Sequence, residues 1–200
     1  AVGSSALLVN TTGTYNVAVG STTLGGNTTT SGNTAVGFYA LKVATATNNS
    51  AFGGDALQKT TTGSYNTAVG HSALVENTTG DENVAVGYLA LNAATTVSDN
   101  TAIGTRALTA NTTATANVAV GFDAGKAITT SARNVIVGFQ AAEATTTGGD
   151  NTVVGYYALG ANTTGTSNVA VGVFALDANT TASNNTAVGA SALSANTTGA

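Results

Sequence analysis

The chain has no cysteine, proline, methionine or tryptophan, and only 7% of its 200 residues are charged. Without cysteine it has neither a disulfide framework nor a thiolate site for zinc or an iron–sulfur cluster. Five basic residues against nine acidic ones give a net charge of −4, which excludes the basic footprint of a nucleic-acid binder. No apolar run approaches the roughly 18 residues of a membrane-spanning helix. No basic, apolar leader opens the chain, so we expect a signal peptide to be absent or already removed.

Small residues dominate the composition in place of the missing and rare types. Thr (39), Ala (38) and Gly (25) supply 102 of the 200 positions. Low charge with few large side chains is also typical of a disordered chain. Composition alone therefore does not distinguish a folded protein from a disordered one, and the order of the residues along the chain has to decide.

A glycine preceded by Val, Ile or Phe recurs along the whole chain. It stands at positions 3, 20, 37, 53, 70, 87, 104, 121, 138, 155, 172 and 189, and the spacing is 17 in ten intervals and 16 between Gly37 and Gly53. The consensus is N-(V/T)-A-V-G-x-x-A-L-x-A-N-T-T-G-(S/T)-x. A disordered tract has a composition but no register, so this periodicity indicates that each position has a fixed structural role.

The repeat predicts an all-β fold. N-T-A-V-G alternates and is β-branched, which is typical of a short strand, and A-L-x-A is expected to form a second, weaker one. T-T-G and the Asn are turn formers. We therefore expect a parallel β-solenoid (β-roll) of about twelve 17-residue coils, about 4.8 Å apart. Residues 1–200 would form a single continuous repeat domain, and proline is absent because it cannot donate to the ladder.

Two columns of the repeat have a direct physical explanation. The glycine is expected to need positive φ or a close backbone approach. The asparagine four residues before the next glycine is expected to form a structural ladder, in which each amide bonds to those in the coils above and below. A ligand-binding row is the alternative interpretation of that column. Its members are Asn16, Asn33, Asn49, Asn66, Asn83, Asn100, Asn117, Asn134, Asn151, Asn168 and Asn185.

The main strand is apolar on both faces. Val, as in Val69 and Val86, points one way, and Ala, as in Ala68 and Ala85, points the other. A strand with two apolar faces is normally buried on both. We expect the Val and Leu columns to fill the coil and the Ala column to meet another chain; the reverse assignment is the alternative. The prediction is a homotrimer, intertwined or side by side, and the competing hypothesis is a monomer with an Ala-rich surface.

The chain begins and ends inside a repeat, without the polar caps that solenoids need. We therefore expect a domain uncapped at both ends, as a segment of a longer fibre or a subunit that stacks end to end.

The N-T-A-V-G-x-x-A-L repeat resembles two related groups of proteins. One comprises the heads of trimeric autotransporter adhesins, left-handed parallel β-rolls with an S-V-A-I-G-like strand. The other comprises phage tail-fibre and bacterial surface proteins with runs like N-T-A-V-G-Y-x-A-L-x-x-N-T-T-G. Residues 151–165 and 83–91 match best, and the similarity covers essentially the whole chain. It implies a trimeric, extracellular, protease-resistant attachment shaft on a virion or cell surface. The autotransporter period is shorter than 17, so the phage-fibre-like group fits better.

No constellation of residues points to catalysis. The nine acids are scattered over five repeat positions, His71 stands alone, and no triad-like order surrounds it. The calcium-binding nonapeptide of other β-rolls is missing, and the glycines form no phosphate-binding loop. We expect no enzyme, no metal and no cofactor, and we interpret the charges as aids to solubility.

Eight of the eleven aromatic residues occupy the two variable positions after the repeat glycine. They could stack on sugar rings, stack on one another between coils, or cover a chain junction. Stacking between coils is favoured because Phe122, Phe139 and Tyr156 occupy one position in consecutive coils. The candidate glycan-binding residues are Phe38, Tyr39, Tyr88, Phe122, Phe139, Tyr156, Tyr157 and Phe174.

The Asn-Thr-Thr turn permits two further hypotheses. Nine asparagines lie in glycosylation sequons, although the repeat itself generates the pattern. They are Asn10, Asn27, Asn48, Asn77, Asn111, Asn162, Asn179, Asn184 and Asn196. Ranked threonines also suggest ice binding, but Asp81, Ala132 and Gly149 interrupt the second column that a regular array would need.

Taken together, the sequence favours a non-enzymatic, extracellular structural fibre for attachment. Its partners would be further copies of itself and host-surface glycans, without nucleic acid or membrane insertion. A glycan-binding module is the first alternative and an ice-binding solenoid the second.

Overall fold

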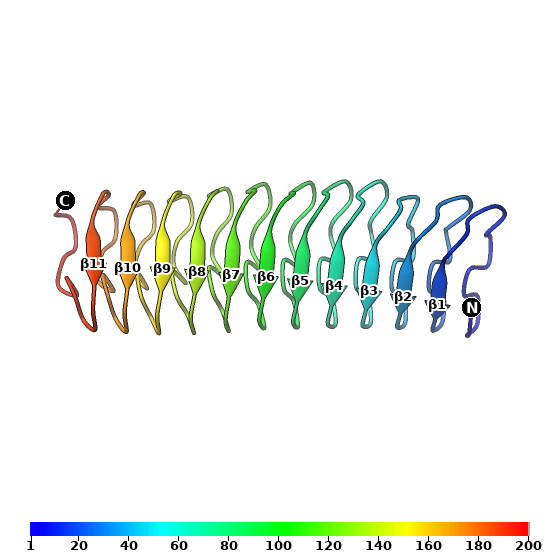
Figure 1. Cartoon of the computed structure of the whole chain (residues 1–200), viewed down its shortest axis with the longest axis horizontal. Coiled ribbons are helices and arrows are strands. Elements are labelled where there is room, and N and C mark those ends of the chain that lie inside the picture. Colours follow the sequence, from blue (N-terminus) through cyan, green and yellow to red (C-terminus); the bar gives the residue numbers. More distant parts are fainter. Residues whose placement is uncertain (200) are drawn as a thin grey trace.

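The computed structural model describes residues 1–199 as an elongated rod of stacked coils (Figure 1). Ala200, the last residue of the expected repeat domain, lies outside the described residues. Each coil contributes one three-residue strand to a single parallel sheet whose strands follow chain order, and an isolated bridge from Val2 to Val19 precedes it. The strands are β1 (Val17–Val19), β2 (Thr34–Val36), β3 (Ser50–Phe52), β4 (Thr67–Val69), β5 (Val84–Val86), β6 (Thr101–Ile103), β7 (Val118–Val120), β8 (Val135–Val137), β9 (Thr152–Val154), β10 (Val169–Val171) and β11 (Thr186–Val188).

The prediction of an all-β parallel β-solenoid is confirmed, with ten turns between β1 and β11. Equivalent repeat positions pair directly: Ala85 lies between Ala68 and Ala102. The 16-residue interval is absorbed between β2 and β3, where Ala35 still pairs with Ala51.

The glycine that follows each strand has both properties expected of it. Gly70 has φ +131°, and a Cβ added there would lie 2.6 Å from the carbonyl oxygen of Gly87 in the next coil. Because backbone occupies that space and L side chains rarely adopt this φ, no other residue fits the position without strain.

The prediction of a second strand at A-L-x-A is wrong. This segment forms consecutive turns in which alternate residues are left-handed, for example Ser72 (φ 55°) and Leu74 (φ 53°). Each left-handed non-glycine residue costs about 1–2 kcal/mol. The turns nevertheless hydrogen-bond from coil to coil, since the Leu74 N–H donates to the Ala90 oxygen over 3.0 Å. These bonds offset the strain without an extended backbone.

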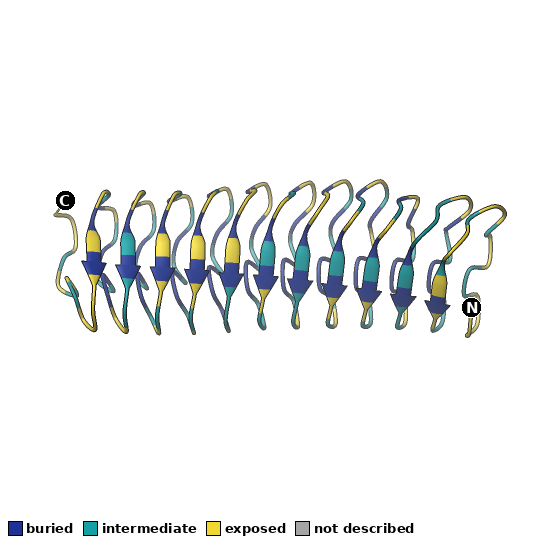
Figure 2. Ribbon diagram, in the orientation of Figure 1, coloured by how far each residue is buried: buried dark blue, intermediate teal, exposed yellow. Residues whose placement is uncertain are grey.

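The expectation that the Val column fills the coil is also wrong. The central Ala of the strand is buried, as at Ala85 and Ala102, whereas the Val, Ile or Phe at the end of the strand faces outward (Figure 2). The interior is narrow, and the buried Leu of the turn, such as Leu91, leaves room for little more than a methyl group opposite it.

Two coils show that the Leu and Ala columns share this space. Where Leu is replaced by Gly125 and Ala142, the central strand residues of the following coils are the larger Ile136 and Val153, both fully buried. A Cβ on Gly125 would lie 3.0 Å from the Ile136 side chain. A loss of volume at one position is thus filled from the other, as close packing requires.

Candidate functional site

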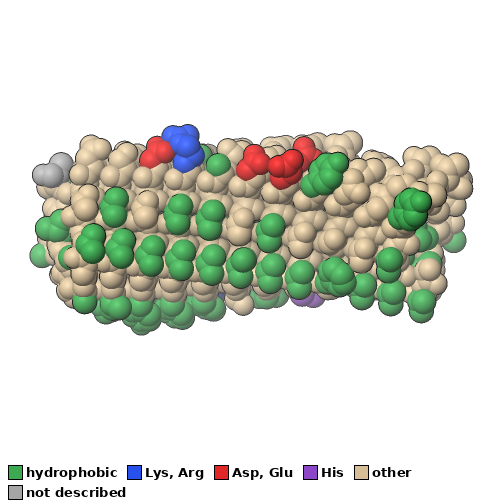
Figure 3. All heavy atoms as spheres, viewed as in Figure 1, with side chains coloured by type: hydrophobic (Ala, Val, Ile, Leu, Met, Phe, Trp, Pro, Cys, Tyr) green, Lys and Arg blue, Asp and Glu red, His purple; other side chains and the backbone are tan. Residues whose placement is uncertain are grey.

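The outer face of the sheet carries a continuous apolar column along the rod, seen as a row in Figure 3. It consists of the last residue of each strand, and several of these, such as Val69, Ile103 and Val137, are more than a third exposed. A second column, of the first strand residues, contains Val, Thr and Ser in irregular order and forms the interrupted row above it. The members of the apolar column are Val19, Val36, Phe52, Val69, Val86, Ile103, Val120, Val137, Val154, Val171 and Val188.

The asparagines of the expected ladder use their side-chain amides for hydrogen bonds within the rod. The Oδ1 of Asn66 accepts from the backbone N–H and the Nδ2 of Asn83, both over 3.0 Å. The Nδ2 of Asn66 donates to the Gly80 oxygen over 2.8 Å. From Asn33 onward the column is buried. A buried amide with its donors and acceptors in use has nothing to offer a ligand.

The sequon asparagines divide by exposure. Asn77 closes its own turn: its Nδ2 donates to the Gly80 oxygen and its Oδ1 accepts from the Gly80 N–H, both over 3.0 Å. Asn27, Asn111, Asn162 and Asn179 are likewise buried. Asn10 and Asn196 are half-buried, and Asn48 and Asn184 are exposed. In the folded rod, therefore, Asn48 and Asn184 are the sequon amides open to a modifying enzyme.

The threonine hydroxyls of the turn also serve the rod. The first Thr of the pair donates to the carbonyl oxygen of its counterpart one coil on, as Thr78 does to Thr95 over 2.9 Å and Thr146 to Thr163 over 3.1 Å. The second Thr, such as Thr96, is exposed. One of the two threonine columns therefore has its hydroxyl hydrogens bonded within the protein. Fewer hydroxyl donors remain to order an ice-like layer of water.

The eight candidate aromatic residues form three groups instead of one face. Phe38 and Tyr39 adjoin each other near the N-terminal end, where Lys42 lies 4.4 Å from the Tyr39 ring centroid. Tyr88 lies beside His71, with ring centroids 6.0 Å apart. The remaining five (Phe122, Phe139, Tyr156, Tyr157 and Phe174) form one cluster.

Within that cluster the rings cover one another. Phe122 and Phe139 are stacked with centroids 5.2 Å apart and planes 13° apart, and Phe139 and Tyr156 at 5.4 Å and 14°. Such a stack turns ring edges to the solvent, whereas binding a sugar by stacking requires a free ring face. The middle ring, Phe139, thus stabilises the coil junction and has both faces occupied.

Four of the charged residues that look scattered in sequence form a line beside this cluster. Arg106 pairs with the buried Asp123 over 2.7 Å, and Lys126 bridges Asp123 (3.4 Å) and Glu143 (2.7 Å). The hydrogen bond that Lys126 donates to Glu143 is the main cause of the raised pKa of Lys126. Partial burial, followed by the neighbouring Tyr156 and Glu143, raises the pKa of the Tyr157 hydroxyl.

Two surface hollows arise at the same repeat position. The residue five after the repeat glycine is itself a glycine in two coils, at Gly25 and Gly160. Beside Gly25 lies a largely apolar hollow of about 330 Å³. Beside Gly160 lies one of about 340 Å³, between Glu143 and Asp177. Sequence analysis missed both, although the exchange of a side chain for glycine in a fixed register was the available signal.

No group of three or more His, Cys, Asp and Glu side chains within residues 1–199 is arranged to hold a metal ion. The described residues include no helix with the length and apolar character needed to cross a bilayer. Comparison with protein families, with curated proteins and with solved structures found no match.

Proposed function

We propose that the chain is a non-enzymatic extracellular shaft that associates as a homotrimer through the outer face of its sheet. The observation that carries the proposal is the apolar column of strand-end residues, which runs unbroken from Val19 to Val188 on the outside of the coil. Parallel sheets are normally covered on both faces, and long exposed apolar patches mark interfaces. In a single chain only the inner face is covered.

A closed ring of three such faces buries the column along the axis, and cyclic symmetry leaves no face open for further growth sideways. The resemblance of the repeat to trimeric adhesin heads and phage fibres supports the same stoichiometry and an attachment role at a virion or cell surface.

The hydrogen bonding between coils gives the rod the stiffness that a spacer requires. Each coil is bonded to the next through the strand, the turns, the buried asparagines and the threonine hydroxyls. These contacts repeat along the whole described length, so a stiff rod with few sites of local opening is expected.

Light scattering after size exclusion tests the proposal. The wild type is expected to have three times the mass of one chain. The double variant Val69→Lys, Val137→Lys places charges on the apolar column four coils apart and is expected to be a folded monomer. The matched control, Thr96→Lys with Thr164→Lys, has the same spacing on the exposed turn and is expected to stay trimeric. A monomeric wild type, or a trimeric face variant, contradicts the proposal.

A further inference from the structure

The hollow beside Gly160 is a consequence of one missing side chain. Glu143 and Asp177 occupy the equivalent position in the coils before and after it, so a gap one coil wide separates two carboxylates. Ala144, Gly160 and Ala161 line the hollow between them, and its volume is about 340 Å³. Ligand pockets begin at about 300 Å³, so the space suits a single small unit.

Tyr157 and Phe174 form an aromatic wall on this hollow. Their rings are stacked, with centroids 5.8 Å apart and planes 17° apart. Tyr156 meets Phe174 edge-on at 5.4 Å, which fixes the wall. The next residue in the column is Ser191, which has no ring, so the stack ends at Phe174. At this end of the cluster, unlike at Phe139, no further ring follows in the column.

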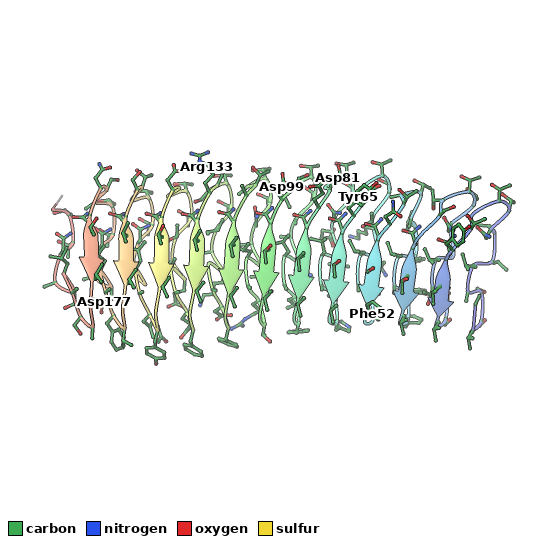
Figure 4. All side chains as sticks on the ribbon, viewed as in Figure 1. Phe52, Tyr65, Asp81, Asp99, Arg133 and Asp177 are labelled. Atoms are coloured by element: carbon green, nitrogen blue, oxygen red, sulfur yellow. The ribbon has the colours of Figure 1, made fainter. Side chains whose placement is uncertain are left out.

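The polar groups of the hollow are unequally satisfied. Glu143 accepts from Lys126 over 2.7 Å and from Gln140 over 2.8 Å. The Oδ1 of Asp177 is shielded from solvent and has no hydrogen-bond partner. A shielded carboxylate oxygen without a donor is unfavourable. Figure 4 shows Asp177 in the lower half of the view, whereas Asp81, Asp99 and Arg133 lie along the upper side of the rod.

We propose that this hollow binds one pyranose ring of a neutral glycan. The apolar CH groups of the sugar pack against the edges of the stacked Tyr157 and Phe174 rings that line the hollow, and its hydroxyl groups donate to Asp177. A polyol supplies several donors and carries no charge to be desolvated. Because Lys126 already pairs with Glu143, Asp177 is the one carboxylate of the hollow left for the ligand. An anionic sugar would be repelled by it.

The proposal is independent of the trimer. None of the residues that line the hollow belongs to the apolar column on the sheet. The sugar-binding proposal and the trimer proposal can therefore be tested, and contradicted, separately.

Saturation-transfer NMR with a panel of neutral methyl glycosides tests the inference on the full chain. At least one is expected to receive saturation on its ring protons. Asp177→Asn and Phe174→Ala are expected to weaken its binding at least about tenfold. Gly160→Thr fills the hollow with a residue that the same position accepts at Thr109, and is expected to abolish binding.

The matched control is Gly25→Thr, which fills the other hollow and is expected to leave sugar binding unchanged. Circular dichroism melting verifies that each variant is folded. No transfer to any glycoside, or transfer undiminished in Gly160→Thr, overturns the proposal. Binding of tetramethylammonium in place of the sugars would assign the hollow to a cation and overturn it as well.

Discussion

The backbone N–H of Asn83 and its side-chain Nδ2 both donate to the Oδ1 of Asn66 one coil earlier, each over 3.0 Å. A single buried side-chain oxygen thus joins two coils through two hydrogen bonds. The Nδ2 of Asn83 also donates to the Val97 oxygen over 2.7 Å, so the residue contacts the coil on each side of its own.

Asn83→Ala is expected to destabilise the rod by about 2–6 kcal/mol. The Asn100 N–H, which donates to Asn83, and the Val97 oxygen both lose a partner in a buried setting, and each such loss costs about 1–3 kcal/mol. Urea unfolding followed by circular dichroism measures the change. Asn92→Ala is the control, because the half-buried Asn92 makes one 3.2 Å bond to Ser72; a cost equal to that of Asn83→Ala would contradict the ladder's role.

Gly70→Ala is expected to be among the most damaging single-methyl additions, at more than about 3 kcal/mol. Its φ is +131° and the added Cβ would lie 2.6 Å from the Gly87 oxygen, so neither rotation nor a small shift relieves the clash. Gly160→Ala, where φ is ordinary and the nearest atom is the Tyr157 oxygen at 3.2 Å, serves as the control. Thermal melting should separate the two; similar melting temperatures would refute the argument.

Leu108→Ala is expected to cost about 2–5 kcal/mol, as typical for a buried Leu that leaves a cavity. Leu108 is fully buried inside the coil, whereas Ile103 is 39% exposed on the outer face. Ile103→Ala should therefore cost clearly less in a monomer. In a trimer its cost should approach that of Leu108→Ala and depend on protein concentration. Unfolding at several concentrations checks this, and a uniformly small effect of Ile103→Ala would argue against the covered face.

The carboxyl of Asp150 is expected to titrate below the ordinary Asp pKa of about 3.9. Hydrogen bonds from Arg133, 2.6 Å and 2.8 Å long, are the main cause of this lowered pKa. A lowered folded-state pKa stabilises the fold above the ordinary pKa, and this contribution is lost as the pH falls through the folded-state value. NMR titration measures the pKa, and Arg133→Gln should return it toward the ordinary value. The pair is exposed, so high salt should weaken the shift.

Much of the coil was predictable from register alone. Glycine and asparagine recur at fixed repeat positions, represented by Gly70 and Asn66, because the strand's end and the turn each accept one residue type. Such constraints act within a few residues of the chain. The second strand was not predictable. Leu74 favours an extended or helical backbone locally, yet it is left-handed here because hydrogen bonds to a neighbouring coil stabilise the turn.

From the sequence, the hollow beside Gly160 could be predicted only as a missing side chain at one repeat position. That Tyr157 and Phe174 form its wall, and that Asp177 lacks a hydrogen-bond partner, depend on side-chain positions set by packing between coils. The same holds for the five-ring cluster: the column of Phe122, Phe139 and Tyr156 indicated stacking, but not how Phe174 would close it.

By itself, the sequence determined a parallel β-solenoid with a 17-residue turn and a glycine after each strand. It left open which face of the strand points inward, since Val86 and Ala85 are both apolar and alternation alone cannot rank them. The tertiary structure decided it: Leu91, curling in from the turn, fills the narrow coil, and the space left across from it accepts a methyl group and excludes Val.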